Sequence, residues 1–153
     1  MLILGIDPGS TTHGYVLVDT DAWRVVESSH SATFDDVVHL ITSNEAIDAV
    51  AIERPHFMGK KNAFKEVFET IWWAAGFYWT ALNCVPHVAA IPRKDVKTHL
   101  LGASNLAKSD SLIMRKMQEQ FSPDALIGVA KHAWQALGTA VTYFDLYVKR
   151  AAK

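Results

Sequence analysis

The sequence predicts an α/β protein in which a mixed sheet of five strands is flanked by helices. Two observations carry this prediction. The first part of the chain alternates short β-strand patterns with turn residues, and the later part places apolar residues at helical spacing around single strands. Strands that come first and are then interleaved with helices are typical of a mixed sheet with helices packed on it.

Three strands open the chain, and the short turns between them favour an antiparallel meander. They are expected at residues 2–7, 13–19 and 23–30. A helix follows over 34–42, where apolar residues recur at helical spacing and Thr33 can serve as the N-cap. It leads into a fourth strand over 47–53.

The longest periodic segment, residues 60–83, predicts a long helix whose C-terminal half is apolar around most of its circumference. A fifth strand over 87–91 ends at Pro92. The remaining helices are expected at residues 95–101, 108–121 and 129–149.

Size and composition favour one domain spanning residues 1–153, with half of its residues apolar. No apolar run approaches the roughly 20 residues that a bilayer requires, and the N-terminus lacks the features of a signal peptide. We therefore expect no membrane partner and a cytoplasmic location. The single cysteine, Cys84, rules out an internal disulfide and a multi-thiolate zinc site, and we expect it to pack in the core.

Charges are segregated along the chain, although the net charge is only −1. Acids predominate between residues 19 and 53, and basic residues follow. A neutral protein with this pattern can still present a locally basic face. The basic residues are Lys60, Lys61, Lys65, Arg93, Lys94, Lys97, Lys108, Arg115, Lys116 and Lys131.

Two apolar strands each end in an acid. Asp7 closes the first strand before a Pro-Gly turn, and Glu53 closes the fourth before Arg54 and Pro55. A buried charge requires a partner or a cation, and Mg²⁺ prefers carboxylate oxygens. The pair therefore predicts a metal site across neighbouring strand tips. The alternatives are an Asx hydrogen bond at Asp7 and an ion pair between Glu53 and Arg54.

Six segments, taken in order along nearly the whole chain, resemble the bacterial RuvC Holliday junction resolvases and their phage-encoded relatives. They are GIDPGS at 5–10, AIERP at 51–55, FMGKKN at 57–62, PRKDVK at 92–97, AKS at 107–109 and HAWQALGTAV at 132–141. The resemblance implies a ribonuclease H-like fold, a homodimer, and hydrolysis of phosphodiesters in Holliday junctions and other branched DNA. It also implies two Mg²⁺ or Mn²⁺ ions per site and no organic cofactor, in a bacterial cell or a phage-infected host.

By this resemblance, the catalytic and metal-binding residues are Asp7, Glu53, His132 and Gln135. Family members usually have Asp-x-x-Asp or His-x-x-Asp in the last helix, so Gln135 departs from the pattern and removes a charge from the site. Three interpretations stay open: a working nuclease, a protein that binds junctions without cutting them, and an engineered inactive form. His132 and Gln135 could also be ordinary residues of an exposed helix.

DNA contacts are also implied by the resemblance. Phe57 matches an aromatic that wedges into the junction centre, and stacking a base on an aromatic is worth roughly 1–3 kcal/mol. The alternative is that Phe57 packs beneath its own loop. Lys97 and Lys108 match basic residues near the scissile phosphate. The further basic residues expected to contact DNA are Lys60, Lys61 and Arg93.

A dimer with two sites suits a four-way junction, which has approximate two-fold symmetry and must be nicked in two strands. The long helix is too apolar to be covered on one side only, so we expect it to form the dimer seam. The alternative is the buried central helix of a monomer. The expected interface residues are Phe64, Phe68, Ile71, Ala75 and Tyr78.

Overall fold

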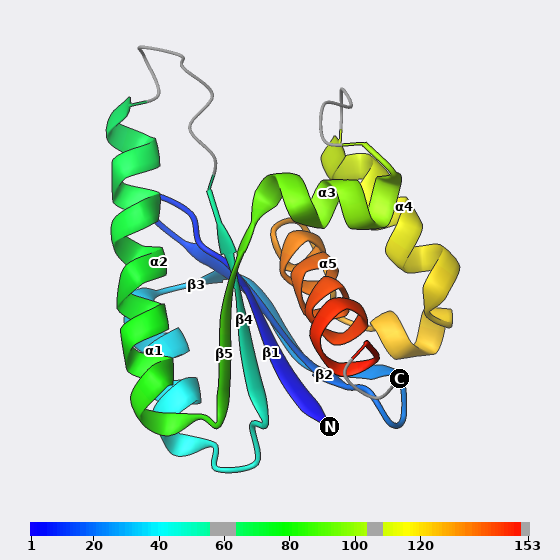
Figure 1. Cartoon of the computed structure of the whole chain (residues 1–153), viewed down its shortest axis with the longest axis horizontal. Helices are drawn as coiled ribbons and strands as arrows, with labels where there is room; N and C mark the ends of the chain where they lie inside the picture. Colours follow the sequence, from blue (N-terminus) through cyan, green and yellow to red (C-terminus); the bar gives the residue numbers. More distant parts are fainter. Residues whose placement is uncertain (56–63, 104–108, 151–153) are drawn as a thin grey trace.

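A five-stranded mixed sheet lies at the centre of the protein (Figure 1). The computed structural model describes residues 1–55, 64–103 and 109–150. The strands are β1 (Leu2–Asp7), β2 (His13–Asp19), β3 (Arg24–Ala32), β4 (Ala49–Arg54) and β5 (His87–Pro92), in the order β3-β2-β1-β4-β5. The first three are antiparallel, as the predicted meander requires, whereas β1, β4 and β5 run parallel. The predicted fold class is confirmed.

Helices cover both faces of the sheet (Figure 1). On one face lie α1 (Phe34–Ser43) and α2 (Phe64–Cys84). On the other lie α3 (Arg93–Leu101), α4 (Ser109–Gln120) and α5 (Ala133–Tyr143). A short 3₁₀ turn, Pro123–Leu126, precedes α5, and a π-helical turn, Phe144–Val148, follows it. No helix in the described ranges is both long and apolar enough to cross a membrane.

The central strands are apolar along their whole length because both of their faces are buried. Ile3 belongs to the core cluster on the side of α5, and its neighbour Leu4 to the cluster on the side of α1 and α2. Ala51 and Ile52 alternate in the same way on β4. A charged side chain at the end of such a strand is therefore held close to the core.

The predicted cap of the first helix is present. Thr33 accepts a hydrogen bond from the backbone N–H of Asp36, and the Asp36 carboxylate accepts one from the backbone N–H of Thr33. This capping box satisfies donors that the first turn of a helix leaves open.

The last helix begins later than predicted. Gly128 and Lys131 have φ angles of +86° and +44°, in the left-handed region, so residues 129–132 cannot continue a right-handed helix. The helix starts at Ala133, and His132 becomes its N-cap residue. Another expectation was wrong: Cys84 is exposed at the end of α2 and does not pack in the core.

One face of α2 is uncovered in the single chain. Ala74, Phe77 and Ala81 face the core, whereas Phe64 and Ile71 are 63% and 45% exposed. Of the other expected seam residues, Phe68 and Ala75 are exposed and Tyr78 is half-buried. The helix is thus not the buried centre of a single chain.

Candidate active site

The two strand-end acids lie at the same edge of the sheet. Strands β1 and β4 are parallel neighbours with Ile6 paired to Ile52, so the next residues, Asp7 and Glu53, lie side by side. Their exposed fractions are only 6% and 2%. The structure thus brings together two buried acids from segments far apart in the sequence.

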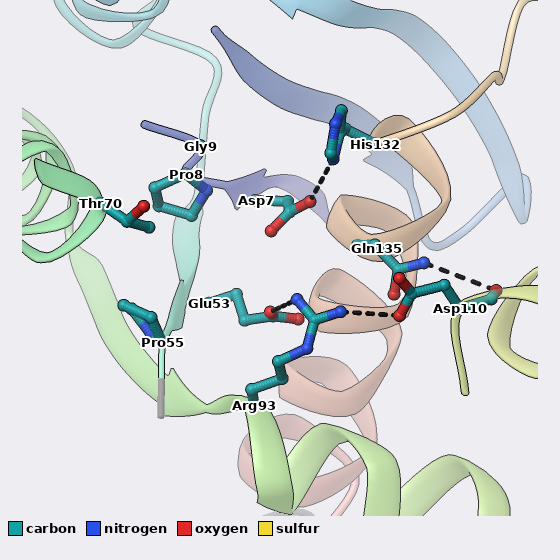
Figure 2. A pocket seen from close by; sticks show the side chains of 10 residues that line it. All are labelled: Asp7, Pro8, Gly9, Glu53, Pro55, Thr70, Arg93, Asp110, His132 and Gln135. Carbon is teal, nitrogen blue, oxygen red and sulfur yellow. Dashed lines mark hydrogen bonds and ion pairs between the residues drawn. The ribbon is translucent and has the colours of Figure 1, made fainter. Parts of the chain in front are cut away.

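A pocket opens at these strand tips (Figure 2). Side chains from β1, β4, α2, α3, α4 and α5 reach it. Its polar and charged lining consists of Asp7, Glu53, Thr70, Arg93, Asp110, His132 and Gln135. All four residues predicted to form the catalytic centre therefore line one pocket, together with Arg93 and Asp110.

His132 contacts Asp7 directly. Its Nδ1 lies 3.2 Å from Asp7 Oδ2, and this hydrogen bond raises the pKa of His132 above the usual value for histidine. The start of α5 and the end of β1 are thereby joined across the pocket.

Gly14 leaves the room that His132 occupies. A Cβ at position 14 would lie 2.6 Å from the His132 carbonyl carbon and 2.8 Å from its Cβ. We therefore expect Gly14→Ala to displace His132 from Asp7 and to lower the pKa of the imidazole toward that of a free histidine, as measured by NMR titration. Gly102→Ala is the control, because a Cβ there meets nothing within 4 Å. An unchanged His132 titration in Gly14→Ala would contradict this account of the contact.

Arg93 joins two acids of the pocket. Its Nη1 lies 2.6 Å from Glu53 Oε1, and its Nη2 lies 2.7 Å from Asp110 Oδ1 (Figure 2). The alternative of an ion pair between Glu53 and Arg54 was wrong, since the partner of Glu53 comes from α3. Arg93, predicted as a DNA contact, here pairs with two of the carboxylates in the pocket.

Glu53 is held in an environment that opposes its charge. Burial raises its pKa to about 7, and repulsion from Asp7 acts in the same direction, whereas Arg93 opposes the rise. Two carboxylates in one buried site destabilise each other's charged forms unless a cation compensates.

Two buried oxygens lack a hydrogen-bond partner among the described residues. They are Glu53 Oε2 and Gln135 Oε1, called here the orphan oxygens. Gln135 is 5% exposed, so the alternative of a solvated helix residue was wrong. Its Nε2 lies 3.5 Å from the Asp110 carbonyl oxygen, which leaves Oε1 available. An unsatisfied buried acceptor is costly, and carboxylate and amide oxygens are donors that Mg²⁺ prefers.

These donors fit a hard divalent cation, but they are not yet gathered around one. Within residues 1–55, 64–103 and 109–150, no three His, Cys, Asp or Glu side chains are grouped as a ready metal site. The Arg93 guanidinium lies between Glu53 and Asp110. The positive group between these two acids is therefore a side chain of the protein itself.

The turn after Asp7 is anchored by two aromatic residues that sequence reasoning missed. The Gly9 N–H donates to His13 Nδ1 at 3.3 Å, and Trp73 Nε1 donates to the Ser10 carbonyl at 3.2 Å. Burial lowers the pKa of His13, which keeps Nδ1 available as an acceptor. Trp73 belongs to α2, so the long helix supports the pocket.

The DNA-contact predictions reach the described structure only in part. Lys97 lies on α3, half-buried, and does not line the pocket. The others, apart from Arg93, lie outside the described residues: Phe57, Lys60, Lys61 and Lys108. Asp110 was missed, although it directly follows the AKS segment at 107–109.

Two solved structures share the fold of this chain. The "Thermus thermophilus RuvC structure" is 23% identical, with a TM-score of 0.68 over 99% of this chain and 97% of that chain. "T. thermophilus RuvC in complex with Holliday junction substrate" is 22% identical, with a TM-score of 0.68 over 99% of this chain and 96% of that chain. No protein-family model matches the sequence, and no curated protein matches it. The fold is RuvC-like and thus ribonuclease H-like, as expected.

Proposed function

We propose that this chain is a dimeric, metal-dependent, structure-selective endonuclease that hydrolyses phosphodiesters in Holliday junctions and other branched DNA. The observation that carries the proposal is the buried pair Asp7 and Glu53 at adjacent strand tips, together with the orphan oxygens, one of which belongs to Glu53 and the other to Gln135. The shared fold with a protein solved in complex with a Holliday junction substrate supports it.

The residues of the pocket have different roles in the proposed reaction. A pair of Mg²⁺ or Mn²⁺ ions, when bound, would supply an activated water and stabilise the leaving oxygen of the phosphodiester. Asp7, Glu53 and Gln135 Oε1 are the residues that would hold these ions. With its proton on Nδ1, His132 would donate a hydrogen bond to Asp7 Oδ2 and so orient that carboxylate, and Nε2 would then be available to the cation or the attacking water.

The proposed DNA contacts are the basic residues and the aromatic residue that the resemblance implies. Lys97, Lys108 and Arg93 bind phosphates near the scissile bond, Lys60 and Lys61 bind the backbone beyond it, and Phe57 stacks at the junction centre. Phosphate contacts position the substrate without reading its bases. Selectivity for shape rather than sequence follows from this set.

A second function, junction binding with little or no cleavage, is favoured by one specific feature. Gln135 brings no charge, and Arg93 occupies the space between Glu53 and Asp110. A weakly held second ion would slow the reaction and leave the phosphate contacts intact.

One assay separates these functions. A labelled four-way junction, a linear duplex and an RNA/DNA hybrid are incubated with the chain and Mg²⁺ or Mn²⁺, with EDTA as the control. Paired nicks in the junction support the nuclease. Retardation of the junction without product supports the binding protein, and cleavage of the hybrid alone would overturn both.

The homodimer is proposed to form through α2. Besides the exposed Phe64, Phe68 and Ile71, its outer face carries Trp72 and Trp79, which are 65% and 66% exposed. A shallow apolar hollow lies beside it, lined by Ile52, Arg54, Ile71, Ala74, Ala75, Tyr78, Trp79 and Ala90. Apolar surface of this kind marks an interaction site.

Replacing Ile71 by Glu is expected to dissociate the dimer. A charge buried in an apolar interface costs several kcal/mol, so the dissociation constant should rise at least about 100-fold. Light scattering coupled to gel filtration measures the change. Val26→Glu is the matched control, because Val26 is similarly exposed, at 51%, but lies on β3. The proposed dimer interface on α2 would be refuted if the Ile71→Glu variant remained dimeric. It would also be refuted if the parent chain were monomeric at micromolar concentration.

A further inference from the structure

Asp110 lies in the first turn of α4, and its carboxylate reaches the same pocket as Asp7 and Glu53 (Figure 2). Arg93 donates to it and to Glu53 through two nitrogens of one guanidinium, at 2.7 Å and 2.6 Å. One positive group therefore bridges acids that come from β4 and α4. A bridge of this kind indicates that the two carboxylates share a place suited to a cation.

The number of charged ligands in the pocket also indicates a place for Asp110 in a cation site. Divalent cation affinity rises with the number of charged oxygen ligands. Asp7 and Glu53 supply two carboxylates, whereas the oxygen of Gln135 is neutral. Asp110 brings a third carboxylate beside Gln135, whose amide contacts its backbone carbonyl at 3.5 Å. The orphan oxygens belong to residues that line this same pocket, and neither oxygen accepts a hydrogen bond from the described residues.

The Arg93 guanidinium can leave its place between Glu53 and Asp110 and be replaced by another cation. The Arg93 side chain is 29% exposed and that of Asp110 is 64% exposed, so both can change rotamer without opening the core. The side chain of Glu53, by contrast, is only 3% exposed and is enclosed by its surroundings. The structure therefore has one fixed acid, one adjustable acid and a movable cation between them.

We propose that Asp110 is a third carboxylate of the cation site, and that Arg93 is a resident counter-cation which a divalent ion displaces from Glu53 and Asp110. The inference rests on the metal site of the proposed function. Asp110 thus supplies the charge that Gln135 lacks. Once displaced, the Arg93 guanidinium lies at the rim of the pocket with its donors free to bind a phosphate.

The test is Mn²⁺ binding by the full chain without DNA, followed by the electron paramagnetic resonance signal of free Mn²⁺. Asp110→Asn should weaken binding about tenfold, which corresponds to about 1.4 kcal/mol. Asp124→Asn is the matched control: Asp124 is an exposed acid in the 3₁₀ turn before α5, and its loss should change the affinity less than twofold. Equal affinities of Asp110→Asn and the parent chain would overturn the inference.

The displacement is tested separately. Arg93→Gln removes the competing guanidinium and should strengthen Mn²⁺ binding severalfold. Arg93→Lys cannot bridge both acids and should strengthen Mn²⁺ binding to a smaller extent. The lysine variant replaces the glutamine variant in this test if the latter does not fold. No gain in either folded variant would overturn the counter-cation role.

Asp7→Asn distinguishes failure of this inference from failure of the proposed function. If Asp7→Asn binds Mn²⁺ as the parent does, the metal site itself is wrong. If Asp7→Asn weakens binding and Asp110→Asn does not, the proposed function stands and the third carboxylate falls.

Discussion

Asp7→Asn is expected to reduce cleavage of a four-way junction by about 10³-fold or more while leaving junction affinity within about threefold of the parent. Asp7 lies at the strand tip between His132 and Glu53, so its charge would act on the proposed cation, and the amide of asparagine keeps the shape but not the charge. Junction affinity depends on phosphate contacts elsewhere and should survive. The measurements are single-turnover cleavage in Mg²⁺ and a gel-shift titration in EDTA.

Asp35→Asn controls for a general loss of negative charge, since Asp35 is an exposed acid on α1. It should cleave at the parent rate. Full cleavage by Asp7→Asn would show that Asp7 is not a metal ligand. Loss of junction binding by Asp7→Asn would show that Asp7 acts on DNA affinity or on folding instead.

The strands of this fold could be predicted from local sequence. Runs such as 2–7 and 47–53 are apolar throughout, and such runs are typical of strands covered on both faces. These runs can be recognised from the period of the pattern and the position of the turns alone. That Asp7 and Glu53 lie at neighbouring strand tips was inferred from the acid that ends each run, whereas the parallel pairing of β1 with β4 that brings them together was not predicted.

The partners within the pocket could not be predicted, because they depend on how α3, α4 and α5 pack. Nothing local to Glu53 indicates Arg93, which comes from another helix, or relates either residue to Asp110. The start of α5 was misplaced for a related reason. Lys131 adopts a positive φ that its residue type does not favour, so only tertiary packing accounts for it.

Gln135 shows how burial changes the meaning of a substitution. On an exposed helix, glutamine in place of an acid would be unremarkable surface variation. Here the side chain is buried, its amide nitrogen faces the Asp110 carbonyl, and its oxygen is one of the orphan oxygens. The position thus has an oxygen in the pocket without the charge of a carboxylate, and this is the charge that Asp110 is proposed to supply.

Gly5 allows α5 to pack closely on β1. Its replacement by alanine is expected to lower the stability of the protein and to disturb the geometry of the pocket. A Cβ at this position would lie 2.2 Å from the Ala136 carbonyl oxygen and 3.0 Å from Ala140 Cβ. The obstacle is helix backbone, which cannot rotate away, so α5 must move off β1. We expect the free energy of unfolding to fall by about 3 kcal/mol, the upper part of the range for overpacking, in urea denaturation.

Gly102→Ala makes the same chemical change without a clash. Gly102 has a φ of +75° and nothing within 4 Å of a Cβ, so its replacement should cost only about 1–2 kcal/mol of left-handed strain. The two variants differ in a further respect. Because Asp7 follows Gly5 on β1 and His132 caps α5, displacing the helix also lengthens the Asp7–His132 hydrogen bond of 3.2 Å. Gly5→Ala should therefore lower the pKa of His132, and Gly102→Ala should not. Equal stability losses with an unchanged His132 titration would show that close packing of α5 on β1 does not set the geometry of the pocket.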